Sequence, residues 1–204
     1  MSILIKKAAM FGLDARIALA IFGALSVISG AALYSAISES KAVALYQNLL
    51  EINKASEAYY LDTGSKLPFI VGDTNSLKAG NLISNQDSES GWAGPYISYE
   101  QVSANNFYTR HSGLNFATYF YRFANDSWSS SIVGCSSATS GCYEWIMIDG
   151  TNAEKAGIIQ NLFDTLNDRF DTGTDHATGA IRMYTVSATR KQLFVRGLLR
   201  SSTE

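Results

Sequence analysis

Residues Ile17–Ile37 read IALAIFGALSVISGAALYSAI and carry no charged side chain in 21 positions. A helix of that length spans about 31 Å, which matches the hydrocarbon core of a bilayer. Lys6, Lys7 and Arg16 precede this stretch, so its basic flank lies on the N-terminal side. By the positive-inside rule, we expect a cytoplasmic N-terminus and an exported chain from about residue 38 onward.

The helical pattern does not stop where the apolar stretch ends. Apolar residues keep recurring at spacings of three and four as far as Leu61, and polar residues fill the opposite face. We expect Gly64, which follows Asp62 and Thr63, to end the helix in a left-handed cap. The sequence therefore predicts one helix from about Ala15 to Leu61, roughly 70 Å long, apolar all round in its first half and amphipathic in its second.

Residues 65–204 are long enough to bury a core of their own. The polar stretch 65–94 predicts a long connecting loop packed on the helix. A helix is expected at Glu154–Phe170, with Thr151 or Asn152 as its cap. Strands are expected at Tyr96–Val102, Asn106–Arg110, Ala117–Phe123, Tyr143–Ile148, Ala180–Val186 and Gln192–Leu199. The predicted fold class is α+β, a long N-terminal helix packed on an antiparallel sheet.

Composition excludes several classes of protein. Charged residues make up 17% of the 204 residues and aromatic residues 12%, which is unlike a disordered chain. Sixteen basic against eighteen acidic residues leave a net charge of −2, so no global field favours nucleic acid as a partner. The C-terminal run is basic, with Arg190, Lys191, Arg196 and Arg200, and the middle of the chain is acidic. These opposite charges favour contacts between subunits.

The two cysteines bracket the Gly- and Ser-rich segment CSSATSGC. In an exported domain, Cys135 and Cys142 are expected to form a disulfide. A two-thiol metal site would need further ligands, and the chain has only two histidines. Two free thiols are the expectation only for a cytoplasmic domain.

Residues with catalytic or ligand-binding chemistry are sparse. No nucleophile elbow, phosphate loop or zinc-binding His-Glu-x-x-His motif is present, and we expect His111 and His176 in loops. A Ser-His-Asp triad stays open, because its members need not be close in sequence. Four aspartates supply the hard oxygen ligands that Ca²⁺ prefers, although a solvated helix end is the simpler interpretation: Asp164, Asp168, Asp171 and Asp175. We expect no metal, no cofactor and no enzymatic activity.

Four stretches of the chain resemble the type IV pilin superfamily, which includes the pseudopilins of type II secretion systems. The first is the basic leader MSILIKKAAMFG, which ends in Gly12 and is followed directly by the apolar span. The second is Gln47–Pro68, where an aromatic, an Asp and a Gly precede a proline. The third is Gly91–Tyr96, which is similar to the Trp-x-Gly-Pro-Tyr stretch of major pseudopilins. The fourth is the Asp-rich segment Leu166–Arg182.

The resemblance implies cleavage by a prepilin peptidase between Gly12 and Leu13. It divides the chain into a leader (1–12), a transmembrane and assembly half of the helix (13–37), an amphipathic half (38–64) and an exported domain (65–204). The implied function is a structural subunit of a type IV pilus-like or type II secretion pseudopilus filament. The implied partners are further copies, other pilin-like subunits and the bacterial inner membrane. In that membrane the chain would be a single-pass protein until it joins a cell-surface filament.

One position departs from the pilin pattern. Pilins usually place Glu five residues after the cleavage point, where it meets the terminal amine of a neighbouring subunit, and Ile17 stands there in this chain. The nearest acid is Asp14, two residues after Gly12. A carboxylate inside a bilayer is costly and needs a partner, so this difference changes the chemistry of assembly.

Two other interpretations stay open on the sequence. The chain could be a membrane-anchored, extracytoplasmic binding module that never polymerises, or a secreted hydrolase whose signal peptide is removed. The three interpretations differ in the first residue of the mature protein. It is Leu13 for the pilin-like subunit, Ala32 or a neighbour for the secreted hydrolase, and Met1 for the anchored module.

Overall fold

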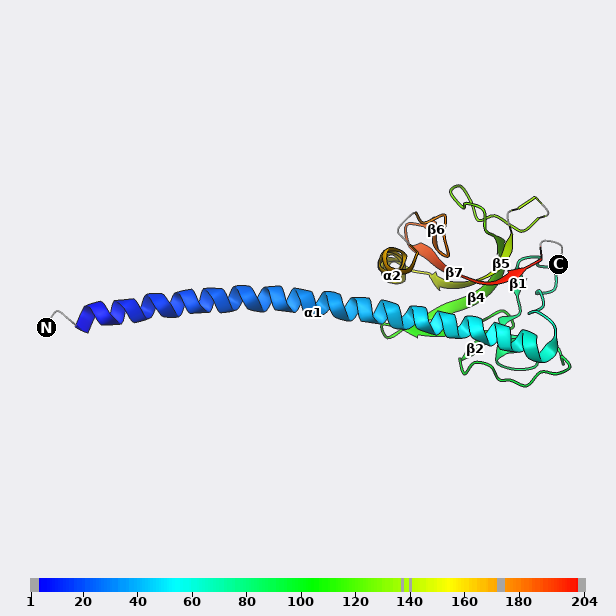
Figure 1. The fold of residues 1–204 in the computed structure, drawn as a ribbon, viewed down its shortest axis with the longest axis horizontal. Helices are drawn as coiled ribbons and strands as arrows, with labels where there is room; N and C mark the ends of the chain where they lie inside the picture. The colour runs from blue at the N-terminus through cyan, green and yellow to red at the C-terminus, as the bar shows by residue number, and fades with distance from the viewer. Residues whose placement is uncertain (1–3, 137, 140, 172–174, 202–204) are drawn as a thin grey trace. The chain divides into compact units, whose positions relative to one another are not determined.

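The computed structural model describes residues 4–136, 138–139, 141–171 and 175–201. The chain divides into two compact units, Met1–Lys41 and Ala42–Glu204. The elements, labelled in Figure 1, are α1 (Leu4–Thr63), β1 (Ser76–Leu77), the 3₁₀ helix η1 (Ala79–Leu82), β2 (Gln101–Ser103), β3 (Asn106–His111), β4 (Leu114–Ala124), β5 (Cys142–Gly150), α2 (Ala153–Phe170), β6 (Ile181–Ser187) and β7 (Arg190–Arg200). This is the expected α+β arrangement.

The seven strands form one antiparallel sheet in the order β2-β3-β4-β5-β7-β6, with β1 paired to the end of β4. One edge of β4 is shared by two strands. β3 pairs with the first half of β4, and β1 pairs with Phe120 and Tyr121 in its second half. The β3–β4 connection is a tight turn in which Ser112 and Gly113 both have positive φ, a backbone that suits a two-residue hairpin.

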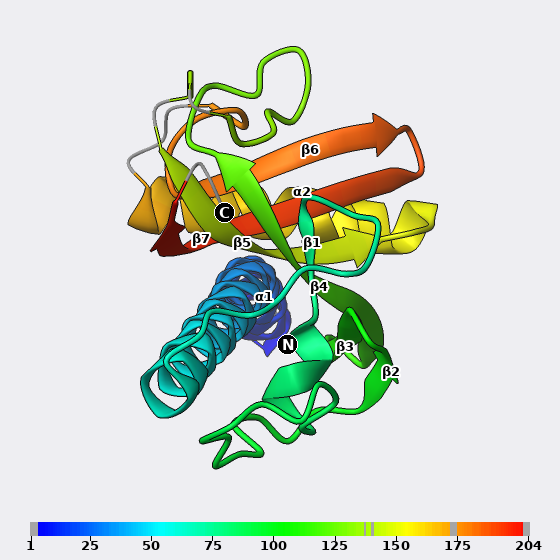
Figure 2. The same cartoon turned by 90° about the vertical axis from the view of Figure 1, so that its right-hand side faces the viewer.

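The two faces of the sheet bury different side chains, because alternate residues of a strand point to opposite sides. On β4, Phe116 and Phe120 belong to the main core, whereas Tyr121 and Phe123 lie on the other face. The second half of α1 and helix α2 share the main core with the sheet. The two helices also touch each other, since the rings of Tyr46 and Phe170 stack with centroids 4.6 Å apart. Figure 2 shows the second half of α1, in cyan, beside β5 and β7.

The second half of α1 supplies one continuous stripe of this core. Its side chains at spacings of three and four are at most 2% exposed: Ala42, Leu45, Leu49, Ile52 and Tyr59. By contrast, Gln47, Glu51 and Lys54 on the opposite side are exposed. The amphipathic pattern expected for 38–64 therefore reflects docking on the sheet, and the compact unit that contains the sheet also includes the helix from Ala42 onward.

Several element boundaries differ from those expected. α1 starts at Leu4 rather than near Ala15 and ends at Thr63, where Gly64 has a φ of 70° and donates its N–H to the Tyr60 carbonyl. The remaining expected strands and the helix α2 are present with shifted ends, and Asn152 is the cap of α2, accepting from the Lys155 N–H. The connecting segment 65–94 also contains β1 and η1, which the sequence did not predict.

The strand expected at Tyr96–Val102 is wrong for most of its length, because only β2 (Gln101–Ser103) pairs there. The N–H groups of Tyr96 and Ile97 both donate to the Leu82 carbonyl at the end of η1, at 2.8 and 3.2 Å. This segment is therefore tied to a turn rather than to a neighbouring strand, and alternation of side chains alone could not reveal that.

Replacement by alanine should destabilise the protein more at Gly91 than at Gly72. Both have a φ near +80°, which costs an L-residue about 1–2 kcal/mol, but a Cβ at Gly91 would overlap the Asp62 carbonyl whereas one at Gly72 meets nothing within 4 Å. We expect Gly91→Ala to lower the free energy of unfolding by about 1–3 kcal/mol more than Gly72→Ala, measured by denaturant unfolding of the full chain in detergent. Equal losses for the two variants would contradict this close packing at the end of α1.

Candidate functional site

The first half of α1 is an apolar surface that its own chain leaves uncovered. Every described side chain from Gly12 to Lys41 is exposed, and the large apolar ones range from 46% exposed at Ile37 to 77% at Tyr34. By length and composition this helix can cross a membrane. Gly12 and Leu13, the residues expected to flank the processing site, lie within α1, and Leu13 is 60% exposed.

Three glycines lie along this exposed segment. A Cβ built at Gly12, Gly23 or Gly30 would meet nothing within 4 Å. These positions therefore have room for a neighbouring helix backbone, and small residues are what allow two helices to approach closely in lipid. The surface can bind either lipid or another apolar helix, because both replace water at the same side chains.

The second half of α1 is fastened to the domain by a buried polar network that the sequence did not predict. Ser56 donates through Oγ to Glu144 Oε2 at 2.7 Å, and Arg200 Nη1 donates to Glu144 Oε1 at 3.2 Å. Arg200 also donates to the Leu67 carbonyl at 3.0 and 3.1 Å, and its guanidinium lies 5.4 Å from the Phe69 ring centroid. The side chains of Arg200 and Glu144 are 3% and 0% exposed. The network therefore joins α1, β5, β7 and the loop after α1 in a place that water does not reach.

A second close contact lies one helical turn away. Asn53 donates through Nδ2 to the Arg196 carbonyl at 3.2 Å, and a Cβ at Gly197 would overlap the Asn53 side chain. The absence of a side chain at Gly197 is thus what lets α1 approach β7. Residues 196–200, which the sequence marked only as a basic strand, therefore make polar and close contacts with the helix, directly or through Glu144, beside its apolar docking.

The end of α1 is held by the Gly91–Tyr96 stretch. Tyr96 donates through its hydroxyl to Asp62 Oδ2 at 2.9 Å, and Trp92 donates through Nε1 to the Asn81 carbonyl at 2.7 Å. Gly94–Pro95 is a cis peptide bond. Burial raises the pKa of Tyr59, beneath this stretch, to about 12. These contacts hold the segment Gly91–Tyr96 against the C-terminal end of α1.

On the other face of the sheet, Arg182 is enclosed by tryptophans. Its guanidinium lies 4.5 Å from the Trp128 ring and 4.6 Å from the Trp145 ring, and it donates to the carbonyls of Asn125 and Asp126 at 2.8 Å each. Burial lowers its pKa to about 10, so it stays charged at neutral pH. This cluster anchors the start of the loop that connects β4 to β5.

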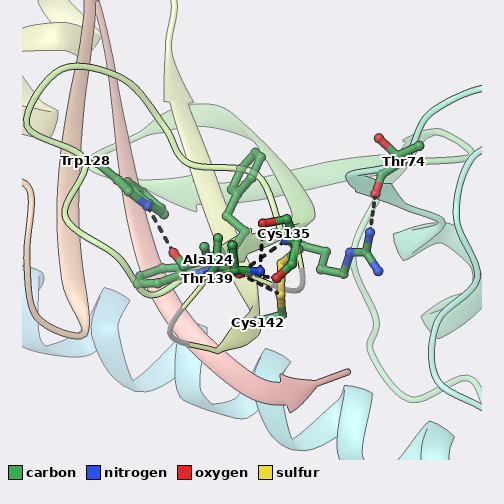
Figure 3. Close-up of a disulfide and its surroundings, with 11 residues drawn as sticks. Thr74, Ala124, Trp128, Cys135, Thr139 and Cys142 are labelled. Carbon is green, nitrogen blue, oxygen red and sulfur yellow. Dashed lines mark hydrogen bonds between the residues drawn. A yellow bond between two sulfur atoms is a disulfide. The ribbon is translucent and has the colours of Figure 1, made fainter. Parts of the chain in front are cut away.

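Cys135 and Cys142 are joined by a disulfide at the end of the same loop, as Figure 3 shows. Their Cα atoms lie 5.7 Å apart, within the range of ordinary disulfides. Cys142 is the first residue of β5 and is fully buried, and the loop carrying Cys135 returns to the sheet through the Ala124 N–H, which donates to the Val133 carbonyl. The bond closes the loop against the strand.

The histidines and the aspartates singled out in the sequence do not converge. His111 is the last residue of β3 rather than a loop residue, and His176 lies in the turn before β6. Asp171 accepts from the Ile181 N–H at 2.7 Å, and Asp175 accepts from the Ala177 and Thr178 N–H groups, which lowers its pKa. Residues 172–174 of the expected calcium turn lie outside the described residues. Within the described part, no three His, Cys, Asp or Glu side chains could hold a metal ion together.

Comparison with known proteins identifies no relative. No family model, no curated protein and no solved structure matches the chain significantly.

Breaking the buried ion pair should be far more costly than breaking an exposed one. Removing one partner leaves a buried charge uncompensated, so Arg200→Ala should lower the free energy of unfolding by about 3–5 kcal/mol. The matched exposed pair is Lys54–Glu51, whose side chains are 67% and 66% exposed, and Lys54→Ala should cost less than about 1 kcal/mol. Denaturant unfolding followed by tryptophan fluorescence measures both, and comparable losses would contradict the network.

Proposed function

We propose that this protein is a structural subunit of a type IV pilus-like or type II secretion pseudopilus filament, assembled through its hydrophobic N-terminal helix. One observation carries the proposal. α1 has an apolar first half, exposed on every side, and a second half whose apolar stripe is buried by its own domain. A subunit held in the inner membrane before assembly and by other helices afterwards needs this division of one helix.

The physical driver is the lack of any other cover for residues 13–37. Before assembly the bilayer solvates this segment, and the C-terminal domain lies on the exported side. After extraction from the bilayer, the same surface must be covered by equivalent helices of other copies or of other pilin-like subunits. Because lipid is as apolar as the helix, the association depends on close packing at small residues such as Gly23 and Gly30.

The N-terminal chemistry differs from that of a usual pilin. Processing by a prepilin peptidase between Gly12 and Leu13 would expose a terminal amine on Leu13, the residue directly before Asp14. Asp14 is the only acidic residue in the sequence before Glu39, so it is the one carboxylate of this region that could meet the amine of a neighbouring copy. With Ile17 in place of the usual Glu, the filament core relies more on apolar packing than on charge.

Bulky residues at the helix glycines should abolish assembly while leaving the domain folded. We expect Gly23→Leu and Gly30→Leu to keep membrane fractionation and the unfolding transition of the domain, and to lose the ladder of higher-order species in crosslinking of intact cells. Ala44→Leu, which adds similar bulk at an exposed α1 position outside the apolar span, is the matched control and should keep the ladder.

Leu25→Lys tests the same surface more severely. A charge near the centre of a transmembrane helix costs about 2.5–3.5 kcal/mol on insertion scales, so this variant should lose membrane insertion as well as assembly. If the bulky glycine variants give the wild-type ladder, helix packing through this face does not assemble the protein. If the wild-type chain gives no ladder, a membrane-anchored binding module is the better function.

A further inference from the structure

We draw no further inference here: the strongest candidate, the pocket at the C-terminal end of α1 that is lined by Tyr60, Lys66, Phe69 and Arg200, carries nothing, because Arg200 already belongs to the buried network that fastens α1 and nothing in the structure shows what covers the pocket.

Discussion

Docking of the second half of α1 onto the sheet is the interaction on which the rest of the domain depends. Leu45, Leu49, Ile52 and Tyr59 are at most 2% exposed, and they complete a core to which one face of the sheet and α2 also contribute. Without this helix the sheet would expose that face to water. This docking involves α1 only from Ala42 onward, which is where the compact unit that contains the sheet begins.

The polar groups beneath α1 add specificity to this docking. A buried ion pair is weak evidence for stability, since desolvation offsets much of its attraction. Its hydrogen bonds nevertheless require one arrangement. Glu144 accepts from both Ser56 and Arg200, and Arg200 also donates to the Leu67 carbonyl. A helix that slid or rotated on an apolar sheet would lose few contacts, whereas one that displaced Ser56 would leave a buried carboxylate short of a donor. The network therefore sets the register of α1.

The sequence predicted elements with strong periodicity and missed those set by tertiary contacts. The long helix, α2 and the antiparallel strands follow from spacings of three, four and two, and the exposed apolar half follows from Ile17–Ile37. The segment Tyr96–Ile97 was misassigned because its N–H groups bond to Leu82. Glu144 and Arg200 lie 56 residues apart, and no local pattern pairs them. A charged residue alternating with apolar ones in a strand, as Glu144 does, was the available signal.

The central claim is that residues 13–37 are covered by equivalent helices once the protein leaves the membrane. Electron cryomicroscopy of filaments sheared from cells that produce the full chain tests it most directly. The account predicts a filament whose axis is formed by these helices, with the domains from Ala42 onward on the outside. Recovery of the chain only as a single-pass membrane protein, with no ordered assembly in the sheared or the membrane fraction, would contradict it.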